Sequence, residues 1–504
     1  MANPVQIVIF GASGDLTAQK LVPALASLAR KQEPAGGFVL VGVARRAKTD
    51  EQFRQDLREL QPPEGREAFD ACSGQIRYFA GDVKRPEDIR ALGAYLDGLP
   101  GGAAAGRLFY FSLMPDLFGP AVNNLAQAGM LEMALPAGPW RRVVVEKPFG
   151  HDLASARALN QTLQGCLRED QIYRIDHYLG KETVQNLFAF RFNNTIFEPV
   201  WNRRHVELVQ ITVAETGGVE PGRVGYYDTA GAMSDMMQNH MLQILAMVAM
   251  EPPSSLDPEE VRGQKVSALK SLRFRGDPGH SVRARYGPGV LRGNPVAGYL
   301  EEGAAADSTT ETFVAVRAEL ENWRWSGVPF LLRHGKRMPK KFTEVKVQFR
   351  VPPIQLADYA LLKDGDQEQR LPTGSQDGPV CVLRPNVLTL SIQPREAVSL
   401  SFSVKAPGGG MVMVPADLAF DYRDRFGTST TPAYERLLLD AIQGDPTLFL
   451  RADEVEASWR FTDTVRASWT GPGAPPLLEY PAGGWGPPEA DELFHGCEGG
   501  WSRG

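Results

Sequence analysis

The feature that most constrains the fold is an alternation of apolar runs and helical patterns in the first third of the chain. The runs "VQIVIF" (from Val5), "GFVLVGVAR" (from Gly37), "RLFYFSL" and "RRVVVEKP" are rich in β-branched and aromatic residues. Such runs are typical of strands buried on both faces. The segment "LTAQKLVPALASLAR" after the first run has apolar residues near helical spacing. Strands alternating with helices predict a doubly wound α/β domain with a parallel sheet over residues 1–175.

The remainder of the chain, residues 176–504, has a different pattern. Its strand-like segments alternate apolar and polar residues, which predicts a predominantly antiparallel sheet with one open face. These segments are 205–215, 312–322, 343–351, 387–394 and 397–405. Helical patterns at 232–250 and 432–445 interrupt them, so we expect a larger α+β second domain with helices on one face of the sheet. The Gly/Pro-rich segment 471–490 predicts an extended, partly disordered C-terminal tail.

Composition narrows the classes of function. The 504 residues carry a formal net charge of -6, so the chain has no basic footprint for nucleic acid. The four cysteines have no spacing typical of a metal site or a disulfide framework, which indicates a reducing compartment; they are Cys72, Cys166, Cys381 and Cys497. The N-terminus lacks the features of a secretory signal, and no apolar run reaches the roughly 18 residues that a membrane span needs. We therefore expect a cytoplasmic protein with no membrane partner.

The loop "GASGDL" lies where the first strand gives way to a helix. Gly11 permits a tight turn, Gly14 lets a phosphate approach the backbone, and the free N–H groups at the helix start attract an anion. The spacing differs from the GxGxxG fingerprint, so the loop indicates either dinucleotide binding or a plain strand-to-helix turn.

The end of the second strand presents Arg45 and Arg46 where an NAD site usually places an acidic residue. Guanidinium groups favour a 2′-phosphate and hence NADP, and the alternative is two arginines on a surface turn. Lys147 follows another buried strand in "VVVEKPFG", at the edge where ligands collect in open α/β sheets, although lysines also end strands for solubility. Pro148 after it predicts a cis turn.

Three further segments concentrate polar groups. "YRIDHYLGKE" (173–182) is either a solvated helix face or a site. His240 lies on the flank of an apolar helical stripe, where a histidine is either a satisfied core residue or a base. "FLLRHGKRMPKKF" (330–342) predicts a basic loop, either solvated or supplying counter-charge for a phosphate.

Taken together, these motifs resemble the glucose-6-phosphate dehydrogenase family along nearly the whole chain. The resemblance rests on "GASGDL", "EKPFG", "RIDHYLGKE", "FEPVWNR", "DMMQNH", "GVPFLLRHGK" and "AYERLLLD", in that order. It implies a Rossmann-type domain followed by a β+α domain. It also implies oxidation of glucose 6-phosphate to the 6-phosphogluconolactone with NADP, the first step of the oxidative pentose phosphate pathway, by a homodimer or homotetramer.

The resemblance implies a role for each matching residue. His240 resembles the general base that removes the C1 hydroxyl proton, and Asp176 its carboxylate partner. His177, Tyr178 and Lys181 resemble a 6-phosphate site, with His177 and Lys181 expected on one face of a helical turn. The other substrate residues implied are Glu215, Asp235, Lys336, Lys341, Lys20 and Lys147. The cofactor residues implied are Gly11, Ser13, Gly14, Asp15, Leu16, Arg45, Arg46 and Lys147.

The chain departs from the family pattern at a few positions. Gln19 stands where relatives commonly carry lysine, which weakens cofactor phosphate contacts. The turn "SLMP" (112–115) replaces an Ala-Leu-Pro-Pro turn and changes the local backbone shape. His334 replaces a threonine beside Lys336, and we expect it to make substrate binding more dependent on pH.

Two alternative functions compete with this interpretation. One is another Rossmann sugar oxidoreductase in which Lys147 is catalytic and His240 structural. The other is a non-catalytic NADP-binding paralogue. The first leaves the groups at His177 and Lys181 unexplained, and the second does not require a base together with its orienting carboxylate.

Overall fold

The computed structural model describes most of the chain. The described residues are 4–131, 139–220, 222–277, 279–354, 358–359, 385–408, 412–427, 432–471, 473–497 and 499–504. Among the cysteines, Cys72, Cys166 and Cys497 carry free thiols, and Cys381 lies outside the described residues.

The chain forms two compact units, each assembled from separate segments. Unit 1 contains residues 1–185, 238–270 and 431–463. Unit 2 contains residues 186–237, 271–430 and 464–504. The sequence division at 175/176 is simpler than this arrangement, because two later segments pack with the first sheet.

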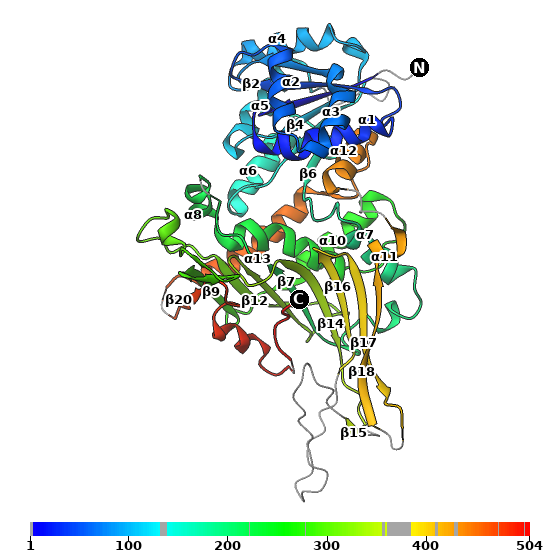
Figure 1. The fold of residues 1–504 in the computed structure, drawn as a ribbon, viewed down its shortest axis with the longest axis vertical. Helices are drawn as coiled ribbons and strands as arrows, with labels where there is room; N and C mark the ends of the chain where they lie inside the picture. Colours follow the sequence, from blue (N-terminus) through cyan, green and yellow to red (C-terminus); the bar gives the residue numbers. More distant parts are fainter. Residues whose placement is uncertain are drawn as a thin grey trace, which may run out of the picture. The chain divides into compact units, whose positions relative to one another are not determined.

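Within the described residues, unit 1 is built on a seven-stranded sheet, drawn mainly in blue and cyan in Figure 1. Its strand order is β19-β6-β5-β4-β1-β2-β3, and all neighbours are parallel except β19, which runs antiparallel to β6. The strands are β1 (Val5–Phe10), β2 (Phe38–Ala44), β3 (Ile76–Ala80), β4 (Arg107–Phe111), β5 (Arg141–Val145), β6 (Ile172–Ile175) and β19 (Phe449–Leu450). Strands β1 to β6 have the order of a dinucleotide-binding sheet, in which the direction of the strand order reverses between β1 and β4.

Helices bury the two faces of this sheet. Ile7 and Ile9 of β1 join a core with α1, α2, α3 and α12, whereas Phe111 of β4 stacks on Phe118 of α5, at 6.2 Å between ring centroids. The helices of unit 1 are α1 (Val22–Arg30), α2 (Asp50–Glu59), α3 (Arg66–Cys72), α4 (Pro86–Asp97), α5 (Phe118–Gln127), α6 (Leu153–Gln164), α9 (Leu242–Ala249), α10 (Pro258–Ser271, which ends in unit 2) and α12 (Ala433–Gln443). We expected the helical pattern at 432–445 in the second domain, but Leu437 and Leu438 of α12 bury their side chains in the core of unit 1.

Besides α10, whose last residue belongs to unit 2, three helical elements pass from one unit into the other. They are α7 (Glu182–Phe192), α13 (Ala452–Ala467) and the π-helical segment η8 (Met233–Met241), which continues directly into α9. π-Helical turns are rare and occur often at functional sites.

Unit 2 is built on a large mixed sheet, with eleven strands in the part of the chain that the structure describes. The order is β15-β18-β17-β16-β14-β7-β13-β12-β9-β20, with β8 paired to β12. The strands are β7 (Val206–Ala214), β8 (Leu272–Arg273), β9 (Ser281–Gly287), β12 (Phe313–Leu320), β13 (Pro329–Gly335), β14 (Phe342–Phe349), β15 (Asp358–Tyr359), β16 (Val387–Gln393), β17 (Ala397–Lys405), β18 (Val412–Asp421) and β20 (Leu477–Pro481). Most pairs are antiparallel, and the five segments with period two are β7, β12, β14, β16 and β17, which confirms the expected fold class.

Two parts of unit 2 differ from the sequence expectation. The first part of the predicted basic loop at 330–342, residues 330–335, belongs to strand β13. This strand is buried throughout between β7 and β12 and therefore lacks a polar face to reveal it. The predicted tail contains β20, which pairs in parallel with β9, and a short 3-10 segment η10 (Pro488–Phe494). Tyr480 and Trp501 bury their rings in the core of unit 2, so these described parts of the tail are packed.

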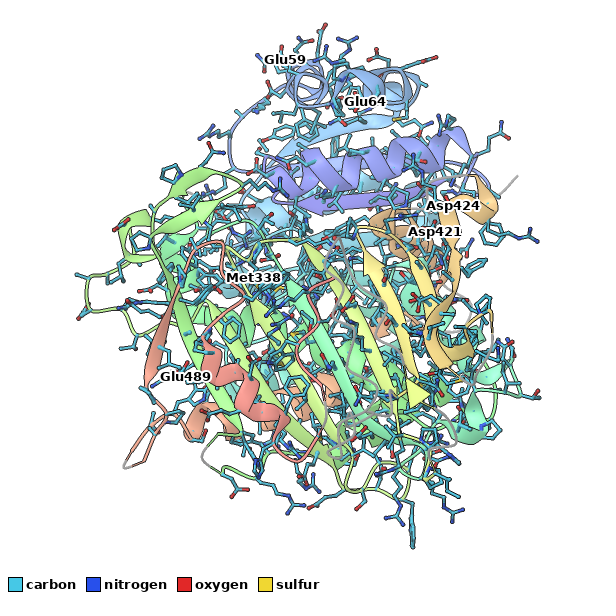
Figure 2. All side chains as sticks on the ribbon, turned by 60° about the horizontal axis from the view of Figure 1, so that its bottom comes forward. Glu59, Glu64, Met338, Asp421, Asp424 and Glu489 are labelled. Atoms are coloured by element: carbon cyan, nitrogen blue, oxygen red, sulfur yellow. The ribbon has the colours of Figure 1, made fainter. Side chains whose placement is uncertain are left out.

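The edge of this sheet around β18 carries exposed apolar side chains. Leu418 is 64% exposed, and Phe420 and Phe426 contact each other's rings on the same surface. Figure 2 labels Asp421 and Asp424 where β18 passes into α11 (Tyr422–Phe426), and the Asp421 carboxylate caps this helix. The remaining helix of unit 2 is α8 (Val224–Ala232). None of the described helices combines the length and the apolar character needed to cross a bilayer.

Candidate functional site

The glycine-rich loop lies in unit 1 at the carboxyl end of β1, where the strand order reverses. Gly11 has φ +81°, and a Cβ there would lie 1.9 Å from the carbonyl oxygen of Ser112, so only glycine fits beneath the 112–115 turn. The Gly14 N–H donates to the Gly11 carbonyl (3.0 Å), which closes the loop. Asp15 and Leu16 continue the loop into the π-helical η1 (Thr17–Leu21), where Lys20 is exposed.

A pocket of about 490 Å³ opens beside this loop. Its lining includes Gly11, Ser13, Gly14, Arg45, Arg46, Asp82, Lys84, Ser112, Asp116 and backbone around them. Arg45 and Arg46 are exposed at the end of β2, as the sequence predicted. Backbone donors at a helix start together with arginines fit the pyrophosphate and the 2′-phosphate of a dinucleotide.

Sequence reasoning missed two residues of this pocket region. The Tyr78 hydroxyl, from β3, donates to the Arg46 carbonyl and lies 3.3 Å from the Ala44 carbonyl; it also hydrogen bonds the Ser13 side chain. Tyr78 thereby connects the glycine-rich loop to the end of β2. Lys84 follows β3 and adds a cation to the lining. A tyrosine and a lysine at a third strand end carry no local signal that separates them from ordinary surface residues.

A buried acid-base pair lies elsewhere in unit 1. The Asp176 Oδ1 atom is 2.6 Å from His240 Nδ1, and each side chain is 1% exposed. Asp176 follows β6, and His240 lies in η8, 64 residues later. Burial alone would raise the pKa of Asp176, but the His240 imidazole lowers it below its usual value. The ionised carboxylate therefore fixes the Nδ1–H tautomer of His240, which leaves the lone pair on the Nε2 atom as a proton acceptor.

The residues after Asp176 form tight turns. Leu179 N–H donates to the Asp176 carbonyl (3.0 Å), and Lys181 N–H donates to the Tyr178 carbonyl (3.2 Å). The prediction that His177 and Lys181 share one face of a helical turn is therefore wrong, because α7 begins only at Glu182. Their side chains still contact neighbouring rings of this group. The His177 and His240 ring centroids are 4.6 Å apart, and Lys181 Nζ lies 4.1 Å from the centroid of the Tyr178 ring.

Lys147 belongs to the same group of residues. Burial lowers the pKa of His177, the neighbouring His240, Lys147 and Lys181 lower it further, and Asp176 opposes them. The two lysines supply positive charge suited to an anion. The Lys147–Pro148 peptide is cis, and the Trp459 indole N–H donates to the Phe149 carbonyl (2.8 Å) beside it.

Glu146 and Tyr434 belong to two of the family-like motifs, "EKPFG" and "AYERLLLD", but the sequence predicted no role for them. Burial raises the pKa of Glu146, and its carboxyl accepts hydrogen bonds from the Tyr110 and Tyr434 hydroxyls. The Tyr434 ring lies parallel to the His177 ring at 6.1 Å. Arg174 and Glu169, also in or beside this charged stretch, form a buried ion pair (2.6 Å) that explains part of its charge density structurally.

A second group of charged residues lies in unit 2, and we describe it by itself as the 215/235/336 cluster. Lys336 Nζ lies 2.7 Å from Glu215 Oε2 and 3.9 Å from Asp235 Oδ2. Burial opposes ionisation of Glu215, but Lys336 keeps the pKa of Glu215 below its usual value. The Tyr227 ring lies 5.1 Å from Lys336 Nζ. Met338, labelled in Figure 2, donates its N–H to the Glu215 carbonyl (2.8 Å). This bond holds the backbone that follows Lys336 next to Glu215.

His334 and Lys341 are not members of this cluster: His334 is buried, and Lys341 is exposed. His334 is fully buried in β13, and its Nδ1 lies 2.9 Å from the Val213 carbonyl. Burial lowers its pKa to about 4. This lowered pKa favours the neutral imidazole near pH 7, so the structure does not support the expectation that His334 makes substrate binding more dependent on pH in that range. Lys341 is exposed next to the start of β14.

Among the described residues, one group has the geometry to hold a metal ion. Atoms of Asp176, His177 and His240 all lie within 4.8 Å of one another. The direct bond between Asp176 and His240 Nδ1 uses the carboxylate and the nitrogen that a metal would need. We therefore interpret this group as an acid-base pair with a neighbouring histidine.

The comparisons with known proteins decide the family. The family model described as "Glucose-6-phosphate dehydrogenase, NAD binding domain" matches residues 8–186, and the one described as "Glucose-6-phosphate dehydrogenase, C-terminal domain" matches residues 188–502. This chain belongs to the glucose-6-phosphate dehydrogenase family.

Individual relatives of this glucose-6-phosphate dehydrogenase family match along their whole length. The glucose-6-phosphate 1-dehydrogenase of Mycolicibacterium smegmatis is 41% identical over 98% of this chain and 96% of its own. That of Aggregatibacter actinomycetemcomitans is 42% identical over 97% and 95%. A solved glucose-6-phosphate dehydrogenase in complex with its substrate glucose-6-phosphate has a TM-score of 0.84 at 32% identity and covers 100% of both chains.

These matches confirm several expectations from the sequence. The chain is an oxidoreductase with glucose-6-phosphate 1-dehydrogenase activity, it uses NADP, and its activity belongs to the pentose phosphate pathway. The structure brings Asp176, His177, Tyr178, Lys181, Lys147 and His240 together in unit 1, and Glu215, Asp235 and Lys336 together in unit 2.

Proposed function

We propose that His240 is the general base of glucose 6-phosphate oxidation and that Asp176 orients it. The observation that carries this proposal is the 2.6 Å bond between Asp176 Oδ1 and His240 Nδ1, buried on both sides. His240 Nε2 takes the proton of the C1 hydroxyl while the C1 hydrogen leaves as hydride, which yields 6-phospho-D-glucono-1,5-lactone. The oxidised nicotinamide ring, when bound, supplies the hydride acceptor. Asp176 stabilises the imidazolium that forms.

The 6-phosphate is bound, in this proposal, by His177, Tyr178 and Lys181, with Lys147 and Lys20 toward the cofactor. The turn at 176–181 supports this role because it places a lysine and two rings next to the base, and Lys147 adds charge there. Phosphate oxygens favour clustered charge-assisted donors, and a substrate held by its far end presents C1 at a fixed distance.

The 215/235/336 cluster binds the sugar hydroxyls in this proposal. A sugar hydroxyl both donates and accepts hydrogen bonds. The carboxylates of Glu215 and Asp235 can accept from it, and the ammonium group of Lys336 can donate to it. Lys341 adds a further exposed cation along the chain.

The residues that would hold NADP are Gly11, Ser13, Gly14, Asp15 and Leu16 of the loop, together with Lys147. Arg45 and Arg46 bind the 2′-phosphate. The pocket lining of the loop glycines, Ser13 and both arginines supports this assignment. In functional terms, residues 1–175 bind the cofactor and residues 176–504 bind substrate and form the oligomer, and the two family models meet close to this boundary.

The protein works in the cytoplasm as a homodimer or homotetramer, without nucleic acid as a partner, in this proposal. The exposed apolar residues around β18 support self-association, because burying the side chains of Leu418 and Phe420 against a second copy removes apolar surface from water.

Replacement of His240 tests the proposed base. His240→Ala should lower kcat at least about 100-fold while calorimetric binding of glucose 6-phosphate stays within a few-fold. His151→Ala, an exposed histidine of the same unit, is the matched control and should keep full turnover. If His240→Ala turns over normally and Lys147→Ala does not, the base is wrongly assigned and the sugar oxidoreductase alternative replaces it.

A further inference from the structure

The segment Ser308, Thr309, Thr310, Glu311 and Thr312 leads into β12 and hydrogen bonds the backbone of η8 and of Lys336, which carry two members of the 215/235/336 cluster. We call it the 308–312 segment. Ser308, Glu311 and Thr312 are buried, with side chains or whole residues below 9% exposed, although all three are polar. Buried polar groups are retained where they have partners, so the partners of this segment indicate what it holds in place.

The first half of the segment holds helix α8. The Ser308 hydroxyl donates to the Asp228 carboxylate, and the Thr310 hydroxyl donates to the Asp228 carbonyl (2.6 Å). Tyr299 donates to the same carboxylate (2.8 Å). Because Asp228 follows Tyr227, these bonds fix the ring that lies beside Lys336.

Glu311 holds the beginning of η8. Its Oε1 atom accepts from the Met233 N–H (2.9 Å), and its backbone carbonyl accepts from the Ala232 N–H (2.9 Å). The residue that precedes this turn is Gly231, with φ +65°, which has no side chain to serve as a local cap. The cap of this helical segment therefore comes from Glu311, 78 residues from Met233, and Asp235 lies two residues beyond the capped N–H.

Space around the cap is tight. A Cβ on Gly231 would lie 2.3 Å from Glu311 Oε1, so glycine at 231 and the carboxylate at 311 occupy adjoining space. The neighbour Thr312 anchors the other side of the cluster, because its carbonyl accepts from the Lys336 N–H (3.0 Å). Glu311 and Thr312, which are consecutive, thus accept hydrogen bonds from the backbone near Asp235 and from the backbone of Lys336.

We propose that Glu311 is a positioning residue for substrate binding, which sets the distance between Asp235 and Lys336 by capping η8. This inference rests on the proposed role of the 215/235/336 cluster in binding sugar hydroxyls. Lys336 is held to Glu215 by a close contact of 2.7 Å, whereas its 3.9 Å separation from Asp235 depends on where η8 begins. Loss of the cap frees the first turn of η8, and Asp235 moves with it.

Glu311→Ala and Glu311→Gln test the proposal, with Glu319→Ala as the matched control on β12, the strand that follows Glu311. Glutamine keeps an oxygen that accepts from Met233 N–H, whereas alanine removes it. Removal of a cap should raise the KM for glucose 6-phosphate about tenfold in Glu311→Ala and leave kcat and the KM for NADP within about twofold. Glu311→Gln and Glu319→Ala, whose carboxylate pairs with Arg275 on the surface, should both stay within about twofold of the wild type in all three constants.

Gly231→Ala supplies a second test that keeps Glu311 in place. Its Cβ displaces the carboxylate from Met233, so it should raise the KM for glucose 6-phosphate in the same direction. An unchanged KM for glucose 6-phosphate in folded Glu311→Ala or in Gly231→Ala overturns the inference. Asp235→Asn separates this outcome from the proposed function: if Asp235→Asn raises that KM, the cluster binds sugar and only the role of Glu311 is wrong. If Asp235→Asn leaves it unchanged, the proposed sugar site itself is wrong.

Discussion

Asp176 and His240 form a direct hydrogen bond of 2.6 Å between side chains that are each 1% exposed. In water such a bond exchanges with solvent, but here both side chains are buried and the rings of His177 and Tyr178 pack against the His240 ring. The carboxylate is ionised because the imidazole lowers its pKa against the effect of burial. This enclosed pair gives the imidazole one tautomer and one orientation before any substrate binds.

Asp176→Asn should lower kcat by about 100-fold to 10,000-fold, because a neutral amide can donate to Nδ1, select the other tautomer and stabilise the imidazolium less. The KM for glucose 6-phosphate should change only a few-fold. Steady-state kinetics measure both constants, and circular dichroism checks the fold. A variant with normal kcat would remove Asp176 from the mechanism.

Lys181→Ala should raise the KM for glucose 6-phosphate about tenfold to 100-fold, since a charge-assisted bond to phosphate is worth about 1.5–3 kcal/mol. The kcat at saturating sugar and the KM for NADP should stay close to wild type. Lys270→Ala, an exposed lysine at the end of α10, is the control. Equal KM values in the two variants would place the phosphate elsewhere.

Arg45→Ala should raise the KM for NADP about tenfold to 100-fold and leave the KM for NAD almost unchanged, because only NADP carries the 2′-phosphate. Initial rates with the two cofactors at fixed glucose 6-phosphate measure the difference. Arg58→Ala, which removes an exposed arginine paired with Asp70 in the same unit, should change neither constant. Parallel losses with both cofactors would mean that Arg45 supports the fold of the pocket and not its selectivity.

His334→Thr should flatten the dependence of stability on pH below neutrality. The folded protein holds His334 with a pKa of about 4, whereas the unfolded chain has the ordinary value of 6.5. Between these values the unfolded state binds more protons, so the wild type loses stability as the pH falls from 6.5 to 4, by roughly 3 kcal/mol from this residue. Urea unfolding at pH 7, 5.5 and 4 should show this loss in the wild type and not in the variant. The dependence of substrate KM on pH between 6 and 8 should be the same for both proteins.

Leu418→Lys should weaken self-association, since it places a charge among the exposed apolar residues around β18. Sedimentation velocity of the wild type should give a dimer or tetramer, and the variant should shift toward the monomer. Leu256→Lys, which changes an even more exposed leucine in unit 1, is the control. A variant with the wild-type sedimentation coefficient would exclude β18 from the interface.

Local patterns were enough to predict many elements. The strand at Val5–Phe10, the glycine-rich turn and the arginines after β2 follow one another within 46 residues, and each carries its own signal of period, turn residue or charge. The five alternating strands of unit 2 were predicted because apolar and polar residues alternate along their sequences, although of the five only β16 alternates regularly in burial and β7 is buried almost throughout. Strand β13 was missed because it is buried on both faces, so Arg333 and His334 read as part of a loop.

Contacts across long stretches of chain could not be derived from pattern. The bond between Asp176 and His240 was expected only through the family resemblance, and the turn geometry after Asp176 was predicted wrongly as helical. Nothing local to Glu311 distinguishes it from the other acidic residues of its surroundings, since its partner at Met233 is 78 residues away. The Tyr78 contacts with Arg46 and Ser13 likewise require β3 and the loop to lie side by side.

The sequence by itself determined the fold class, the family and the positions of the glycine-rich loop and the charged motifs, because these depend on periods and turn residues within short windows. The tertiary structure decided that α12 packs in unit 1, that His334 is buried with a lowered pKa, and that η8 is capped by Glu311, which precedes β12. These outcomes depend on which groups are removed from water together, since burial sets the pKa of an imidazole and a remote carboxylate completes a helix start that glycine leaves without a side-chain cap.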